Sequence, residues 1–148
     1  MLTITSLLQK FQTIETEAII QDSFNDTQYQ FELIQQNQLI AGKTNTGDPI
    51  SPPYKNEKYS TKKNAMNPLP GPGIPDLFLT GSFSKQINAI PEGDRILIFS
   101  NDEKAPVLED KYKNIFGLGT NFKIQYLNEN LGPSLREKIT NFIGLQFA

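Results

Sequence analysis

Apolar positions recur every three or four residues at the start of the chain, which is the spacing of one face of an α-helix. The residues on this face are Ile4, Leu7, Leu8, Phe11, Ile14, Ala18 and Ile19. They predict an amphipathic helix over 3–21 with Thr3 or Thr5 as its N-cap. Turn-forming residues fill 22–27, and a second helix is expected over 26–41, followed by Gly42 as a C-cap glycine. The pattern leaves open whether the two helices join as one bent rod.

The periodic pattern stops between 42 and 76, a segment that holds seven of the ten prolines and four of the ten glycines. A structureless loop of ~12–15 residues is already unusual in a compact domain. We therefore predict an extended arm or loop over 42–76, with one or two helical turns from Asn56 to Asn64.

Strand-like patterns appear after residue 77. Two segments, 85–90 and 95–100, flank the turn residues Pro91-Glu92-Gly93-Asp94, so they predict a β-hairpin. Further helices are expected over 105–113 and 132–144, the latter with a proline near its first position. The alternation of Phe122, Ile124 and Tyr126 favours a strand over 121–127, with a helical turn as the alternative.

These elements predict one α+β domain over 1–148: a helical part over 1–41, the arm over 42–76, and an α+β core over 77–148. In the core, a small antiparallel sheet or hairpin packs with the C-terminal helix. Hydrophobic residues make up 37% of the 148 residues. A chain of this size buries about 70% of its unfolded surface, which is enough for one modest core.

The composition limits the chemistry. The chain has no Cys and no His, which excludes disulfides, thiolate nucleophiles, the usual zinc sites and imidazole acid–base catalysis. The net charge of −2 gives no global signal for nucleic acid. The N-terminal segment does not resemble a signal peptide, and no apolar run approaches the ~20 residues of a membrane span. We expect a protein that is cytosolic when made, with no enzyme activity, no cofactor and no membrane partner.

Several polar groups are candidate sites, but each has a simpler structural role that the sequence favours. Asp102-Glu103 and Glu109-Asp110 are paired carboxylates, but charge runs usually mark solvated faces. Asp76 is expected in a turn or capping role. Gly71-Pro72-Gly73 is expected to be a plain turn, because no Lys-Ser/Thr pair follows it. Ser82 and Ser84 have no histidine base.

The best binding candidate is the arm, in which basic and aromatic residues interleave. Its candidate contact residues are Lys43, Tyr54, Lys55, Lys58, Tyr59, Lys62 and Lys63. A solubilising arm, a protein-docking arm and a single-strand nucleic-acid contact all fit this composition. The arm lacks Arg, the preferred planar fork for phosphate.

Three stretches, in order, carry a family resemblance: "DLFLTGSFSKQI", "GDRILIFSND" and "LEDKYKNIFGL". Followed by a closing amphipathic helix, they resemble small virion-morphogenesis proteins of tailed bacteriophages, the tail-completion or neck (head–tail joining) class. The stretch "LIAGKTNTGDPISPPYKNEKYSTKK" is also similar to the one before the Thr-Gly of that class, particularly in uncharacterised proteins of Bacteroidetes phages and prophages. The "Pro-x-Arg-x-Phe" before the last helix is replaced by Gly119-Thr120-Asn121-Phe122, which leaves neck, tail terminator and other virion rings open.

The resemblance implies a structural virion subunit that forms a homo-oligomeric ring, commonly sixfold, located in the neck or tail and in the host cytoplasm during assembly. Its implied partners are portal, connector or tail-tube proteins, with incidental contact to packaged DNA. The arm would then become ordered on a neighbouring subunit. Leu79, Thr80, Gly81 and Phe83 form the expected structural joint, where Thr80 caps a short helix and Gly81 allows a left-handed backbone. A protein- or nucleic-acid-binding module that uses the arm is the alternative.

Overall fold

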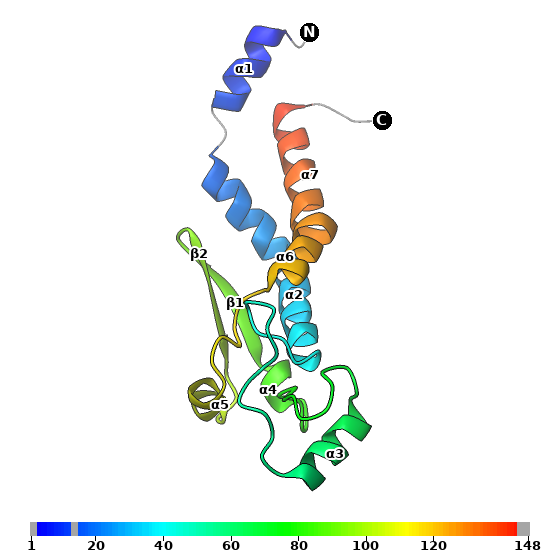
Figure 1. The fold of residues 1–148 in the computed structure, drawn as a ribbon. Coiled ribbons are helices and arrows are strands. Elements are labelled where there is room, and N and C mark those ends of the chain that lie inside the picture. The colour runs from blue at the N-terminus through cyan, green and yellow to red at the C-terminus, as the bar shows by residue number, and fades with distance from the viewer. Residues whose placement is uncertain (1–2, 13–14, 145–148) are drawn as a thin grey trace.

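A computed structural model describes residues 3–12 and 15–144, apart from the side chain of Phe11, and shows an elongated α+β molecule (Figure 1). The predicted fold class is confirmed. The elements in chain order are α1 (Ile4–Gln12), α2 (Thr16–Ile40), α3 (Glu57–Met66), α4 (Ser82–Lys85), β1 (Ile87–Glu92), β2 (Arg95–Ser100), α5 (Ala105–Lys111), α6 (Thr120–Tyr126), the π-helical turn η1 (Leu127–Leu131) and α7 (Gly132–Ile143).

Helix α2 is one 25-residue helix that passes through the predicted turn at 22–27. The predicted boundary is therefore wrong, and Ile14, assigned to the first helix, lies outside the described residues. The turn-forming side chains are used elsewhere: Thr27 Oγ1 donates to Ser23 O at 2.8 Å, and Asp22 and Asp26 both pair with Lys138 of α7 at 2.7 Å. Polar groups with such partners no longer compete with helical backbone.

Two predicted helix ends are confirmed. Thr3 Oγ1 accepts a hydrogen bond from Ser6 N at 3.1 Å, the N-cap arrangement before α1. After α2, Gly42 takes the left-handed conformation with φ 68°, and its N–H donates to Leu39 O at 2.8 Å. A side chain at Gly42 would also collide with Pro70, 2.6 Å from the ideal Cβ position.

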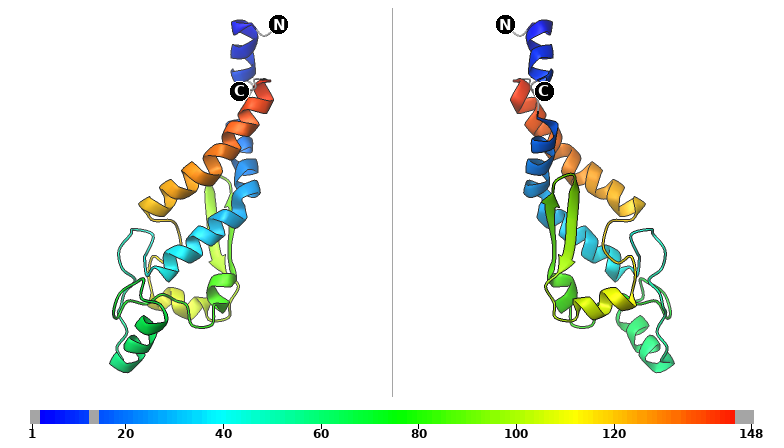
Figure 2. Two further views of the ribbon diagram at one scale, coloured as in Figure 1. Left: turned by 90° about the vertical axis from the view of Figure 1, so that its right-hand side faces the viewer. Right: turned by 90° about the vertical axis from the view of Figure 1, so that its left-hand side faces the viewer.

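The predicted hairpin is confirmed as β1 and β2, paired antiparallel with Ala89 opposite Ile98 and Glu92 opposite Arg95. The hairpin lies along one side of α2, while α7 crosses α2 on the way to the end of the molecule where α1 lies (Figures 1 and 2). In β1, Pro91 and Glu92 are strand residues rather than part of the turn. The first strand therefore lies two residues later than predicted, because Lys85 ends α4 and Gln86 follows as its C-cap.

The predicted strand over 121–127 is wrong, because these residues form α6. Phe122 and Tyr126, four residues apart, pack on the core, while Ile124 between them is 51% exposed. The helix continues through η1 into α7, which confirms the predicted last helix. Gly132 permits this π-helical turn, because a Cβ there would lie 2.6 Å from Leu127 O.

Two apolar clusters form the core, and Ile98 of β2 packs against both of them. In one cluster, the rings of Phe24, Phe31 and Tyr126 meet edge to face with centroids 5.1–6.4 Å apart. The other cluster consists of Leu39, Ile50, Phe83, Ile87, Ala105, Tyr112 and Ile115.

Segment 42–76 is folded against its own chain, which corrects the expectation of an arm that cannot bury itself. Ile50 is 2% exposed within the core, and its N–H donates to Gly42 O at 2.9 Å. The predicted helical turns are present as α3, whose N-cap Asn56 accepts from Tyr59 N at 3.0 Å. The fully buried side chains of Ile50 and Pro75 and the buried ion pair of Lys63 with Asp76 therefore hold this segment against the rest of the chain.

Candidate functional site

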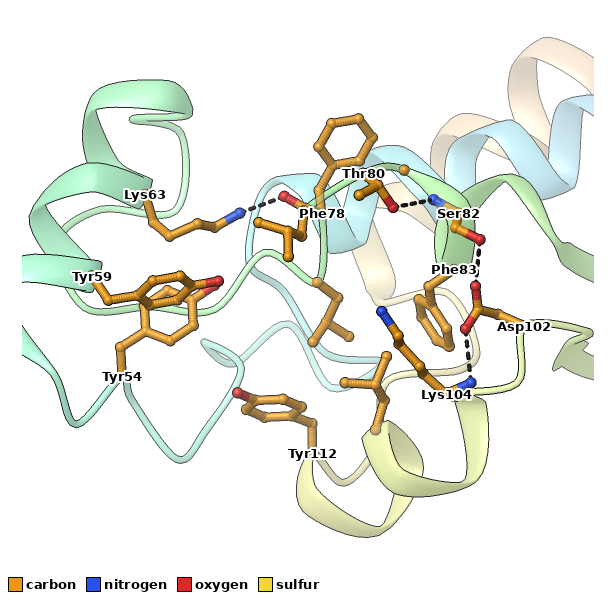
Figure 3. Close-up of a pocket in the computed structure, with 14 residues that line it drawn as sticks. Tyr54, Tyr59, Lys63, Phe78, Thr80, Ser82, Phe83, Asp102, Lys104 and Tyr112 are labelled. Carbon is orange, nitrogen blue, oxygen red and sulfur yellow. Dashed lines mark hydrogen bonds between the residues drawn. The ribbon is translucent and has the colours of Figure 1, made fainter.

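The folded segment, the predicted joint and the start of α5 enclose a pocket of about 190 Å³ (Figure 3). Tyr54, Tyr59 and Lys63 come from the segment, while Ser82 and Phe83 come from α4. Asp102, Lys104, Leu108 and Tyr112 complete it from the region after β2. The two sets of candidate residues predicted separately, arm and joint, therefore meet at one place.

One wall of the pocket is built on the buried carboxylate of Asp76. Lys63 Nζ lies 2.7 Å from Asp76 Oδ1, and the two side chains are 5% and 3% exposed. Lys63 also donates to Phe78 O, and Asn67 Nδ2 donates to the second Asp76 oxygen at 3.0 Å. Burial and the nearby charge of Asp76 raise the pKa of Tyr54. A buried charge is tolerated only when it is paired and hydrogen-bonded, and this network meets both conditions.

The opposite wall is built on Asp102, just after β2. Ser82 Oγ donates to Asp102 Oδ2 at 2.5 Å, and Lys104 N donates to Oδ1 at 2.8 Å. The hydrogen bond from Ser82 is the largest cause, and the one from Lys104 N the next, of a pKa of Asp102 below its usual value. Asp102 is buried, so the expectation of a solvated surface is wrong for this residue and fits Glu103, which is exposed. The carboxylate ties the end of the hairpin to the starts of α4 and α5.

Neither wall is arranged for proton transfer. Asp102 accepts a hydrogen bond from Ser82 Oγ, and its lowered pKa makes the carboxylate a weaker base. Lys63 is engaged by Asp76, whose expected turn role is also present, since Phe78 N donates to Asp76 Oδ1 at 3.1 Å. In residues 3–12 and 15–144, no three metal-ligating side chains gather to hold an ion. Between the two networks the lining is apolar, with Leu77, Phe83 and Leu108.

The structure divides the predicted contact residues of the arm. Lys63 is buried and cannot reach a neighbouring molecule, while Tyr54 and Tyr59 meet edge to face at 5.0 Å. Lys43 lies in a bridge opposite Pro49. The exposed lysines of the set are Lys55, Lys58 and Lys62.

The predicted structural joint, from Leu79 to Phe83, contains the start of helix α4. Gly81 has φ 81°, as expected for a left-handed residue, and is itself the N-cap of α4. Thr80 was predicted as the cap and instead lies one residue earlier, where its Oγ1 accepts from Ser82 N at 3.4 Å. Phe83 is core, stacked on Phe116 with centroids 6.0 Å apart, and Leu79 is 60% exposed.

Two glutamine side chains of α2 form a polar clamp that was not predicted from the sequence, and they bind the backbone of the loop before α6. Gln35 and Gln38 of α2 are both fully buried and bind the backbone of 115–119. Gln35 Nε2 donates to Ile115 O at 3.1 Å, and its Oε1 accepts from Gly117 N at 2.8 Å. Gln38 repeats the pattern with Gly117 O at 2.8 Å and Gly119 N at 2.7 Å. The signal in the sequence was a pair of glutamines on the apolar side of α2.

Comparison with known protein families, with curated proteins and with solved structures finds no match to this chain. Among the helices of the described residues, none is long and apolar enough to cross a bilayer.

Proposed function

We propose that this chain is a structural subunit of a tailed-phage virion, of the neck or tail-completion class, and that it works by contacts between subunits and not by catalysis. The observation that carries the proposal is the apolar surface that one chain leaves uncovered on its outlying elements. On α1, Ile4 and Leu8 are 80% and 57% exposed. Further exposed apolar side chains are Ile90, Ile96, Leu97, Ile124, Leu127 and Phe142.

These exposed side chains support assembly, because apolar surface that one chain leaves uncovered can be buried against a neighbouring subunit. Ile90, Ile96 and Leu97 lie on the hairpin, and Ile124 and Leu127 lie on α6 and η1 near the middle of the molecule. Ile4, Leu8 and Phe142 lie on α1 and α7 at its helical end (Figures 1 and 2). A head-to-tail contact between such surfaces closes into a ring when the rotation permits it. The proposal rests on these surfaces and on the resemblance, and no longer on segment 42–76, which is packed on its own chain.

Particle analysis tests the proposal. In a phage or prophage that encodes this chain, we expect mass spectrometry of purified virions to find it at a fixed copy number. Deleting its gene should leave heads and tails that do not join, as seen by negative-stain electron microscopy. Infectious particles that lack the chain would overturn the proposal.

A second candidate is a polyanion-binding module on α3. Lys58 and Lys62 are four residues apart, so they share one face of this helix, and Lys55 precedes it; all three are exposed. Fluorescence anisotropy with single-stranded DNA tests this candidate, since binding through phosphates falls steeply with salt. The triple change of these lysines to Glu should abolish such binding, and salt-independent binding would reject the candidate.

A further inference from the structure

Strand β2 is the open side of the two-stranded sheet. Its sequence holds four consecutive apolar residues, Ile96-Leu97-Ile98-Phe99, between Arg95 and Ser100. Leu97 and its cross-strand neighbour Ile90 are 44% and 40% exposed on the outer face. Natural edge strands usually carry a lysine, a proline or a bulge that prevents pairing with another chain. The centre of β2 carries none of these.

The hydrogen-bonding register shows which backbone groups face outward. Ala89 N donates to Glu32 Oε1 at 3.0 Å, so this N–H points away from β2, and Pro91 has no N–H. Because antiparallel pairs alternate, Ala89 with Ile98 and Pro91 with Ile96 are the pairs without ladder bonds. The backbone N–H and C=O groups of Ile96, Ile98 and Ser100 therefore point to the free edge.

The edge of β1 is closed in the same molecule. Helix α2 packs along β1, and Glu32 of α2 occupies the outward N–H of Ala89. A sheet that continues from β2 of one copy to β1 of the next is therefore blocked. The segments of the described chain that form strands are β1 and β2, which leaves β2 of a second copy as the matching partner.

We propose that β2 pairs antiparallel with β2 of a second copy, about a twofold axis at Ile98, to form a four-stranded sheet. In this register, Ile98 faces Ile98, and Ile96 faces Ser100 of the other copy, so all three outward residues exchange backbone hydrogen bonds. Leu97 then lies opposite Phe99 of the second copy as a close pair without ladder bonds, where two apolar side chains can contact each other across the strands.

Charge favours the same register. Arg95, whose side chain is 85% exposed, comes to lie opposite Asn101 of the second copy and next to its exposed Glu103. A parallel arrangement would instead place Arg95 against Arg95, which is destabilising. An apolar groove of about 470 Å³ runs between β2 and α6–η1, lined in part by Ile96, Ile98 and Leu127. Pairing brings the two grooves together and covers them.

The contact is small for a stable dimer. The seven paired residues on each side, 95–101, bury less than the ~1,600 Å² of a standard interface, so we expect a concentration-dependent dimer that strengthens inside a larger assembly. This twofold contact uses the exposed side chains of the hairpin, so the head-to-tail contact that a ring requires would use the exposed apolar residues elsewhere, such as Ile4, Leu8 and Phe142. If the chain is a virion subunit but forms no β2 dimer, the dimer proposal alone fails. If it forms the β2 dimer but belongs to no virion, the proposed function alone fails.

Cysteine cross-linking tests the register directly, because the chain has no cysteine of its own. Leu97→Cys mixed with Phe99→Cys should give a disulfide-linked dimer under mild oxidation, since Cα atoms of such a pair lie ~4.5 Å apart. Each variant alone should cross-link far less, because its own residues are diagonal neighbours. Leu69→Cys, in the loop after α3, is the control for random cross-linking. The register would be overturned if the mixture and the two single variants gave equal yields of disulfide-linked dimer, or if Leu69→Cys gave as much dimer as the mixture.

Sedimentation of the full chain tests the surface. Leu97→Lys should raise the dimer dissociation constant at least tenfold, by placing a charge opposite Phe99. Ile96→Pro removes an outward N–H without touching the ladder to β1, and it should have a similar effect. Leu69→Lys, a matched change at a 70% exposed residue, should leave the constant unchanged, and circular dichroism checks that each variant is folded. A monomer at all concentrations, or a dimer insensitive to both β2 changes, would overturn the proposal.

Discussion

At the scale of residues, the buried ion pair between Lys63 and Asp76 makes stability sensitive to a single substitution. The Lys63–Asp76 pair is almost fully buried, and removing one partner leaves the other charge uncompensated. Lys63→Met should therefore lower the free energy of unfolding by about 3–5 kcal/mol, as measured by urea denaturation. The double change Lys63→Met with Asp76→Leu should recover a large part of this loss, because no charge is then left unpaired.

The neighbouring Lys62 provides the matched control for this pair. It is exposed, and surface changes away from special features usually stay within about 0.5 kcal/mol. If Lys62→Met and Lys63→Met cost the same, the buried ion pair does not form in solution.

Asp102 makes a pH-dependent contribution to stability. Its donors lower its pKa in the folded state, so its contribution is present above the unfolded pKa of about 3.9. It is lost as pH falls through the lower, folded pKa. The difference in unfolding free energy between wild type and Asp102→Asn should therefore shrink from pH 7 to the most acid conditions. Asp110→Asn, at an exposed carboxylate, should show little such change, and a pH-independent difference for Asp102→Asn would contradict this account.

At the scale of elements, the clamp from α2 fixes the loop before α6. Gln38 satisfies Gly117 O and Gly119 N, so Gln38→Met leaves two backbone groups without partners. Each such group costs about 1–3 kcal/mol when buried, and thermal or urea unfolding should register the sum. Gln30→Met, on the exposed side of the same helix, should be nearly neutral. A loss at Gln38 no larger than at Gln30 would show that water replaces the clamp.

Local patterns predicted some elements well and others poorly, for physical reasons. The hairpin was found because β-branched residues and a turn with Gly93 agree on one structure. The strand over 121–127 was wrong because Phe122 and Tyr126, four residues apart, fit both the strand and the helix period. The packing of Tyr126 on Phe24 and Phe31 fits the helix, which leaves Ile124 exposed. The break predicted near 22–27 failed because Lys138, more than a hundred residues away, binds the local aspartates.

Across the whole molecule, the candidate site was predicted as two separate pieces. Gly81 was identifiable, since a left-handed position favours glycine, and Tyr54, Tyr59 and Lys63 were identified by composition. Their meeting at one pocket depends on the partners Asp76 and Asp102, which no local pattern connects to them. Composition also suggested an arm that becomes ordered on a neighbour, whereas Ile50, Pro75 and the Lys63–Asp76 pair bury it within its own chain.

The folding of segment 42–76 on its own chain leads to a test of the whole molecule. Ile50 N and Tyr54 N donate to Gly42 O and Gly73 O at 2.9 Å, so both amides should be protected from hydrogen exchange in dilute monomer. Because Ile50 belongs to the central core, its exchange should follow global unfolding rather than local fraying. Hydrogen exchange followed by NMR over a hundredfold concentration range should give the same protection throughout. Protection that appears only at high concentration would mean that neighbouring subunits order the segment, and the packing of Ile50 within one chain would then be refuted.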